Sequence, residues 1–280
     1  MKMQKLYIVM SLILLGACVT SCFKKNDTVQ FDTLEFKERV YLFAANDTTL
    51  PFTNVEIEFT YPKSFKSNDD LARLQQIFNG TFFNDESYDS LSPEEALNSY
   101  IGNYTEEYEE LRDQYNEDMS TLEGDNRPSW YWYQLGKSNE ILFQDKNILS
   151  YSVHHSDYTG GAHGSLNVLY YTVDLNELTT ITEESIFAPN YYKLLTTKIV
   201  ENLMKKFEVD SPEELVNEGI FDVEQIAPNN NFWINNEGVH YIYNQYEIAP
   251  YSMGPIEVTI PYEDIKSIII PNSIAANYIK

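Results

Sequence analysis

Cysteine and histidine are scarce in this chain of 280 residues, which contains 2 cysteines and 4 histidines. Both cysteines, Cys18 and Cys22, lie near the N-terminus, so the rest of the chain can hold neither a disulfide framework nor a thiol nucleophile. Zinc is bound by three or four converging His, Cys or carboxylate ligands, and no spacing in the sequence matches a recognised zinc pattern. We therefore expect no metal and no other cofactor.

Basic residues are also few, because 19 Lys and Arg stand against 43 Asp and Glu and the formal net charge is −24. Such a surface repels nucleic acid and anionic lipid, since phosphate binding depends on clustered Lys and Arg. It would attract a basic partner at long range, or it serves only to keep the protein soluble. Aromatic residues make up 14% of the chain, with 22 tyrosines, which argues against a disordered acidic chain.

No apolar run is long enough to span a bilayer, which requires about 20 residues. The longest run, Leu6 to Leu15, follows two lysines, as in a secretory signal peptide. Two segments that resemble the bacterial lipobox come next, LGAC ending at Cys18 and VTSC ending at Cys22. The sequence predicts a lipoprotein signal peptide over residues 1–22 with lipidation of Cys22, or of Cys18. An ordinary signal peptide followed by a free thiol is the alternative.

The predicted anchor places the protein in the bacterial cell envelope, outside the cytoplasm. Acyl chains such as palmitate would hold it to the membrane, with each buried methylene contributing about 0.8 kcal/mol. Residues 23–30, FKKNDTVQ, read as a short tether between this anchor and the folded part of the chain.

The first folded segment combines strand and helix patterns. Residues 34–42 and 55–61 show the apolar alternation of half-buried strands. A helix capped by Asn68 or Asp69 follows and stops near Gly80. Ser92-Pro93-Glu94-Glu95 then begins a helix that reaches about residue 122, with a break allowed at Gly102-Asn103. The acidic side of this helix is either a solvated face or a docking surface. Together, residues 31–125 are predicted to form an N-terminal α+β unit.

Aromatic strand patterns dominate the second unit, residues 126–280. The predicted strands are 130–135, 141–143, 148–154, 166–173, 232–234, 239–243 and 256–260. A helix is predicted over 191–206, with shorter helical segments elsewhere. The fold class that these patterns favour is α+β, an antiparallel β-sheet meander packed against several helices in two subdomains.

Three of the 4 histidines lie close together, at the doublet His154-His155 and at His163. Consecutive residues of a strand point to opposite faces of the sheet, so only one member of the doublet can join His163 in a site. No complete metal-ligand set follows from this arrangement. The segment also lacks the G-x-S-x-G pattern of a serine nucleophile, and we predict no catalytic residues.

The same segment, YTGGAHG from Tyr158 to Gly164, contains three glycines. Gly160, Gly161 and Gly164 allow positive φ and the close approach of another chain segment. A hairpin or bulged loop between two aromatic strands requires such residues. We interpret these glycines as structural loop residues.

Several motifs occur in a characteristic order. They are YTGGAHG (158–164), Asp174 with the segment 182–187, Asn231-Phe232, YEIAPYSMG (246–254) and VTIPY (258–262). Together they resemble the extracytoplasmic domain of the anti-sigma factor RsiV, a domain of unknown function that is also attached to polysaccharide deacetylases such as PdaC. The resemblance covers roughly residues 30–270.

In RsiV this domain is a receptor that binds lysozyme, so the resemblance implies a binding module. This chain has a predicted lipoprotein signal where RsiV has a sigma-binding segment and a transmembrane helix. It also lacks the aspartate-rich metal motif of the deacetylases. The resemblance therefore implies neither signalling to a sigma factor nor deacetylation.

We accordingly predict a non-enzymatic binding module of a cell-envelope lipoprotein, for a basic protein such as a lysozyme-like muramidase, or for peptidoglycan. Tyr158, His163, Tyr251 and Met253 are the predicted ligand contacts, because they lie in the two motif loops and because aromatics and Met favour interface cores. One alternative is a peptidoglycan-modifying enzyme with His163 and an acid such as Asp157 as its acid–base pair. Another is a structural envelope lipoprotein. Nucleic acid is not expected as a partner.

Overall fold

The computed structural model describes residues 28–43, 47–122 and 127–279. The predicted signal peptide, both candidate lipidation sites (Cys18 and Cys22) and most of the predicted tether lie outside these ranges. Within them, no helix is long and apolar enough to cross a membrane. The lipid anchor therefore stays a prediction.

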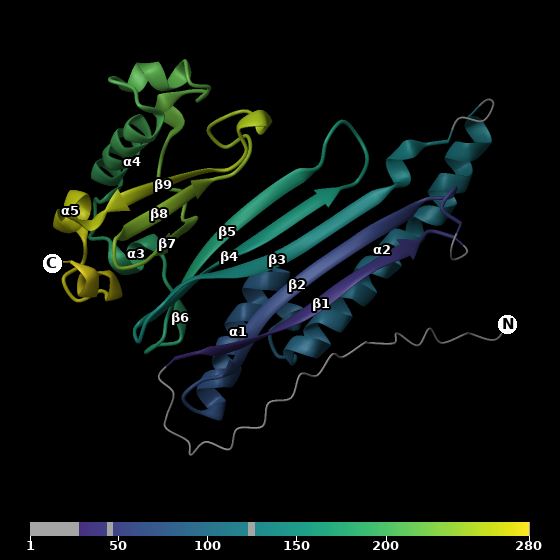
Figure 1. Ribbon diagram of the computed structural model, residues 1–280, viewed down its shortest axis with the longest axis horizontal. Coiled ribbons are helices and arrows are strands. Elements are labelled where there is room, and N and C mark those ends of the chain that lie inside the picture. Colours follow the sequence, from purple (N-terminus) through teal and green to yellow (C-terminus); the bar gives the residue numbers. More distant parts are fainter. Residues whose placement is uncertain (1–27, 44–46, 123–126, 280) are drawn as a thin grey trace.

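Six strands form one large sheet in the order in which they occur in the chain (Figure 1). They are β1 (Gln30–Tyr41), β2 (Phe52–Ser64), β3 (Tyr133–Gln144), β4 (Ile148–Tyr158), β5 (Ser165–Asp174) and β6 (Thr179–Thr180). All neighbours are antiparallel except β2 and β3, which pair in parallel. Parallel neighbours need a crossover connection, and two helices between β2 and β3 provide it.

The crossover helices are α1 (Asn68–Phe83) and α2 (Pro93–Thr121), and both lie on one face of the large sheet (Figure 1). Alternate residues of β2 point to this face. Val55, Ile57 and Phe59 are at most 2% exposed and belong to the same apolar core as residues of both helices. The predicted strand at 55–61 is thus confirmed, because its alternation separates this core face from the solvent face.

The two helices begin at capping residues. Ser92 Oγ accepts a hydrogen bond from the backbone N–H of Glu95, and the Glu95 carboxylate accepts one from the N–H of Ser92, so α2 begins where predicted. The helix continues without a break through Gly102. α1 is capped by Ser67, which accepts from the N–H of Asp70, and not by either of the predicted residues that follow it.

A second sheet and several helices complete the fold. Its antiparallel strands are β7 (Phe232–Ile234), β8 (Gly238–Tyr243) and β9 (Ile256–Pro261), and the helices are α3 (Glu183–Ile186), α4 (Tyr192–Phe207) and α5 (Tyr262–Ile265). Short 3-10 helices span Glu86–Tyr88, Ser129–Tyr131, Pro212–Val216, Val223–Gln225, Tyr251–Met253, Lys266–Ile268 and Ile274–Tyr278. α4 packs on the second sheet, where Val239, Tyr241 and Ile260 are fully buried.

β6 pairs with the outer edge of β5 only at Val173 and Asp174, and side-chain amides bind the edge nearer the start of β5. Asn244 Oδ1 accepts a hydrogen bond from the N–H of Val168 at 2.7 Å, and its Nδ2 donates to the Val168 carbonyl at 3.0 Å. Asn231 Oδ1 accepts from the N–H of Tyr170 at 2.8 Å. Buried backbone groups must be paired, so these amides fix the C-terminal part of the chain against the large sheet.

The predicted α+β class is confirmed, since β3, β4 and β5 form an antiparallel meander and helices cover the sheets. The prediction of two separate strands at 130–135 and 141–143 is wrong, because β3 is one continuous strand over 133–144. Residues 129–131 form a 3-10 turn that buries Tyr131 against Tyr115, with ring centroids 5.3 Å apart. The predicted boundary near residue 125 falls between α2 and β3, so the large sheet draws strands from both predicted units.

Candidate functional site

The loop between β4 and β5 depends on glycine at its closest approaches. Gly160 has φ +88°, and a Cβ at this position would lie 2.6 to 2.7 Å from the Cβ, Cα and carbonyl oxygen of Trp130. A Cβ at Gly164 would lie 2.6 Å from the carbonyl oxygen of Asp157. A side chain at either position would force the backbone apart. These two glycines therefore let the loop fold back on its own strand and on the turn before β3.

The loop between β8 and β9, residues 244–255, reaches the same place from the C-terminal part of the chain. Ile248 and Ala249 are both 2% exposed and belong to the C-terminal core, so they anchor this loop. Tyr246, with φ +68°, is 56% exposed. Gln245 accepts a hydrogen bond from a backbone N–H of β5 at 3.1 Å and donates to the Tyr251 carbonyl at 3.5 Å. Gln245 thus fixes this loop to the start of β5, directly after the β4–β5 loop.

His163, Tyr246 and Tyr251 meet where the loops touch, and we call these three residues the loop cluster. The rings of His163 and Tyr251 are stacked, with centroids 4.0 Å apart and planes 25° apart. His163 Nδ1 donates to the Gly164 carbonyl at 2.9 Å, since a carbonyl oxygen can only accept. The Tyr246 hydroxyl and Nε2 share a hydrogen bond of 3.3 Å. Nδ1 is therefore engaged within its own loop, and Nε2 joins the two loops.

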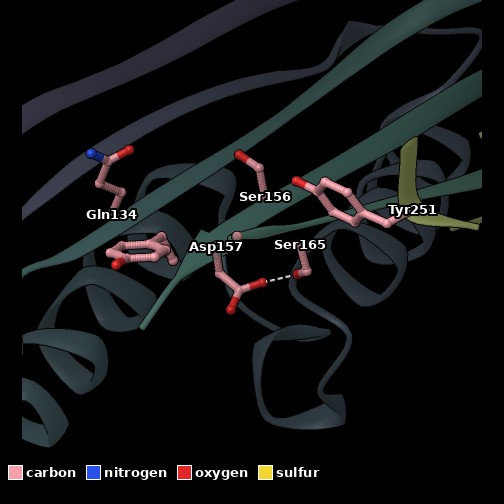
Figure 2. Close-up of a pocket in the computed structure, with 7 residues that line it drawn as sticks. Gln134, Ser156, Asp157, Ser165 and Tyr251 are labelled. Carbon is pink, nitrogen blue, oxygen red and sulfur yellow. Dashed lines mark hydrogen bonds between the residues drawn. The ribbon is translucent and has the colours of Figure 1, made fainter. Parts of the chain in front are cut away.

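A shallow cavity of ≈ 380 Å³ lies beside the loop cluster (Figure 2). Its lining residues are Gln134, Ser156, Asp157, Tyr158, Gly164, Ser165 and Tyr251. The Asp157 carboxylate accepts a hydrogen bond from Ser165 Oγ, drawn in Figure 2. The Tyr158 hydroxyl donates to the Gly161 carbonyl at 3.0 Å. The cavity thus offers a carboxylate, an amide, hydroxyls and two aromatic rings to a ligand.

Three of the predicted contact residues come together here, and the fourth does not. Tyr158 and Tyr251 line the cavity, and His163 stacks on Tyr251. Met253 instead packs against the C-terminal core, with its sulfur so close to Gly219 that a Cβ there would lie 2.6 Å from it. The side chain of Met253 therefore supports the loop from behind.

The other histidines lie apart from the loop cluster. His154 and His155 point to opposite faces of the sheet, and burial lowers the pKa of both. Among the described residues, no group of three or more His, Cys, Asp or Glu side chains is arranged to hold a metal. Within the same ranges, no hydrogen bond or ion pair joins His163 to Asp157. The proposed acid–base pair is therefore not assembled in this structure.

Two surface residues of this region escaped the sequence analysis. Tyr246 is the first residue of the motif YEIAPYSMG, so its place in this motif could have identified it as a contact residue. Trp130 is 48% exposed and lies against Gly160, although the sequence pattern predicted it within a strand. Nothing in the sequence near Trp130 links it to a loop that lies 30 residues further along the chain.

Known proteins share both parts of this architecture. Residues 184–263 match the family model described as "Protein of unknown function (DUF3298)", and residues 53–166 match the one described as "Deacetylase PdaC". Comparison with curated proteins gives no match.

Solved structures extend the likeness to nearly the whole chain. A DUF3298 family protein from Pseudomonas aeruginosa PAO1 is 15% identical, with a TM-score of 0.58 over 87% of this chain and 96% of its own, which concerns the fold alone. A member of the DUF3298 family from Bacteroides fragilis NCTC 9343 has 31% identity and a TM-score of 0.84 over 91% of this chain and 99% of its own. On that identity and coverage, the chain belongs to the DUF3298 family.

Proposed function

We propose that this protein is a lipid-anchored module of the bacterial cell envelope that binds a basic muramidase of the lysozyme type, without catalysis of its own. The observation that carries the proposal is the loop cluster. Two loops, each containing a motif that resembles RsiV, meet and present His163, Tyr246 and Tyr251 beside the Asp157 carboxylate. The resemblance to RsiV, whose domain binds lysozyme, supports this class of partner.

The surface around the loop cluster has the composition of a protein-binding surface. Tyr246 is 56% exposed and Trp130 is 48% exposed, and both are large aromatic side chains. Tyrosine and tryptophan dominate the energetics of protein interfaces. Stacking on His163 holds the ring of Tyr251, and the hydrogen bond to His163 holds that of Tyr246, before a partner arrives. A pre-ordered surface loses little side-chain entropy on binding.

The charge of the chain favours a basic partner. Its formal net charge is −24, and α2 contributes exposed carboxylates along much of its length. Those that are exposed are Glu94, Glu95, Glu106, Glu107, Glu110, Asp113 and Glu117. A field of one sign attracts a protein of the opposite sign and raises its association rate by roughly 10 to 1,000-fold at low salt.

The acid–base alternative is less well supported by the site. An acid–base pair requires an imidazole nitrogen within hydrogen-bond reach of the group that it serves. Both nitrogens of His163 are engaged, one with the Gly164 carbonyl and one with the Tyr246 hydroxyl. The Asp157 carboxylate is engaged with Ser165. Binding therefore accounts for these contacts better than proton transfer does.

Peptidoglycan is the second candidate ligand. The cavity combines the rings of Tyr158 and Tyr251 with the carboxylate of Asp157 and the amide of Gln134. Such a set can stack on a sugar ring and hydrogen-bond its hydroxyl groups. The domain similarity to the family described as "Deacetylase PdaC" is in line with a cell-wall setting.

Calorimetric titration of residues 27–280 with hen egg-white lysozyme, at two salt concentrations, tests the proposal. We expect binding with a Kd of about 1 µM or tighter, weaker at the higher salt because the partners carry opposite charge. Cytochrome c, a basic protein of unrelated fold, is the control and should give no comparable heat. If lysozyme gives no heat at low salt, the muramidase proposal is wrong, and soluble peptidoglycan fragments are then titrated in the same way.

A further inference from the structure

Lys137 is a buried lysine whose ammonium has no acidic partner. Its side chain is 8% exposed, and it lies on the face of β3 that meets α1 and α2. Within residues 28–43, 47–122 and 127–279, no ion pair and no hydrogen bond reaches its Nζ. Five other lysines of the described chain pair with carboxylates: Lys37, Lys63, Lys198, Lys205 and Lys266. Lys137 thus differs from these five lysines in having no carboxylate partner, although the chain is rich in Asp and Glu.

Aromatic rings, and not carboxylates, surround the Lys137 ammonium. Nζ lies 5.0 Å from the ring centroid of Tyr100 on α2 and 5.6 Å from that of Phe82 on α1. Rings attract a cation, but they replace its lost hydration only in part. Burial accordingly lowers the pKa of Lys137 to about 8, so the amine is still mostly charged at neutral pH. A buried charge of this kind is stabilised by an anion.

His155 stands beside Lys137 on the neighbouring strand. The two residues are directly opposed in the β3–β4 ladder, so their side chains leave the same face of the sheet with Cβ atoms about 5 Å apart. His155 Nδ1 is buried and unpartnered within the described chain. Nε2 is not buried, so it is the ring nitrogen that a ligand can reach. Lys137 and His155 therefore offer two adjacent nitrogen donors with no acceptor assigned to them.

Lys137 and His155 lie close to the end of the helical layer. α1 reaches β4 at Tyr151, whose hydroxyl hydrogen-bonds Thr81 at 2.8 Å. Further along the β4–β5 hairpin, Figure 1 shows no helix against the sheet. Asn167, the register partner of His155 on β5, is exposed. Neither Lys137 Nζ nor His155 Nε2 is among the fully buried unpartnered atoms of the described chain, so both nitrogens keep some contact with solvent.

The other titratable groups that face this position are Tyr100 and Tyr104 on α2 and Asp157 on β4. Burial raises the pKa of both tyrosines, that of Tyr100 to about 12, so they are uncharged at neutral pH and can donate hydrogen bonds. The carboxylate of Asp157 lies two residues beyond His155 and accepts from Ser165. The negative charge of Asp157 raises the pKa of His155, against the larger lowering by burial. For Lys137, burial alone lowers the pKa.

We propose that Lys137 and His155 form a binding site for a carboxylate carried on an aromatic or other apolar group. Lys137 supplies the positive charge, His155 supplies a second donor, and the rings of Tyr100 and Phe82 form an apolar wall. This site differs from the surface proposed for muramidase binding, because neither Lys137 nor His155 belongs to the loop cluster or lines the cavity beside it. Of the residues that line that cavity, Asp157 and Ser165 share the face of His155. Tyr158, Ser156 and Gln134, which line the cavity beside the loop cluster, alternate to the other face.

Sodium benzoate is the probe, titrated into the protein at constant ionic strength with sodium chloride as the balancing salt. The readouts are the imidazole signals of His155 by nuclear magnetic resonance and the protection of Lys137 from amine acylation by mass spectrometry. We expect a saturable shift of the His155 signals and protection of Lys137 by benzoate but not by chloride. In Lys137→Met the affinity should fall about tenfold or more, because a charged hydrogen bond is lost.

Lys63→Met is the matched control, since Lys63 lies on the same sheet in a solvent-exposed ion pair with Asp32, and it should bind benzoate as the wild type does. The absence of a saturable response in the wild-type protein would overturn the proposal, whether or not the Lys137 variant folds. Equal affinity in wild type and Lys137→Met would overturn it too. A response to inorganic phosphate without a response to benzoate would overturn the carboxylate assignment.

Discussion

Removing His240 should make the protein more tolerant of mild acid. This histidine on β8 is 7% exposed, and its ring stacks on Trp233 with centroids 4.0 Å and planes 12° apart. Nδ1 shares a hydrogen bond of 2.9 Å with Thr259 Oγ1. Burial lowers the pKa of His240 to about 4. The carboxylate of Glu257 lies 3.6 Å from Nδ1, but its side chain is 41% exposed and water screens its attraction for a ring proton.

The sign and size of the effect follow from the two pKa values. The unfolded chain binds a proton at His240 near pH 6.5, and the folded chain does so near pH 4. Stability that is fully present above pH 6.5 is therefore lost as the pH falls toward 4. These values give a loss of about 2 kcal/mol between pH 7 and pH 5 and a limit of about 3 kcal/mol at lower pH.

Urea unfolding of the wild type and His240→Gln, at pH 7 and at pH 5, measures this loss. Glutamine can keep the hydrogen bond to Thr259 but does not titrate, so the fall in unfolding free energy between the two pH values should be about 2 kcal/mol smaller in the variant. An equal fall in wild type and His240→Gln would refute the reasoning, because the buried ring would then carry no acid penalty.

The remaining predictions concern substitutions in the loops and in the amides that support them. Each effect is measured as a change in the free energy of unfolding in urea. Gly160→Ala should cost about 2 to 4 kcal/mol, because positive φ and the contact with Trp130 act together. Gly161→Ala, with φ +104° but open space around it, should cost only about 1 kcal/mol, and equal costs would contradict this account. Asn244→Leu should cost about 2 to 3 kcal/mol, because the buried N–H of Val168 loses its partner. A cost below about 0.5 kcal/mol would show that water replaces the amide.

Local patterns in the sequence were sufficient for most elements of the fold. The alternation at 55–61 reports one buried and one exposed face, and the capping box at Ser92 fixes the start of α2. The turn at 129–131 was missed because Tyr131 packs against Tyr115, a contact made through the fold and not through neighbours in the chain. The parallel pairing of β2 with β3 also has no local signal, since it depends on where the crossover helices pack.

The candidate site was predictable in part, for a similar reason. The motif loops named Tyr158, His163 and Tyr251, and the structure brings these residues together. The contact between the loops arises from side-chain amides that bind the edge of β5, which no spacing along the chain encodes. Met253 shares a motif with Tyr251, yet a 3-10 turn sends it toward Gly219 and the core.

The most direct test of the central claim compares lysozyme binding by the wild type, Tyr251→Ala and Tyr192→Ala in calorimetric titrations at low salt. Tyr251 belongs to the loop cluster, whereas Tyr192 is a 54% exposed tyrosine on α4 that makes no contact with it. We predict that Tyr251→Ala loses about 2 kcal/mol of binding, or about 30-fold in Kd, and that Tyr192→Ala binds as the wild type does. Wild-type affinity in Tyr251→Ala, with its urea midpoint unchanged, would contradict the assignment of the loop cluster as the binding surface.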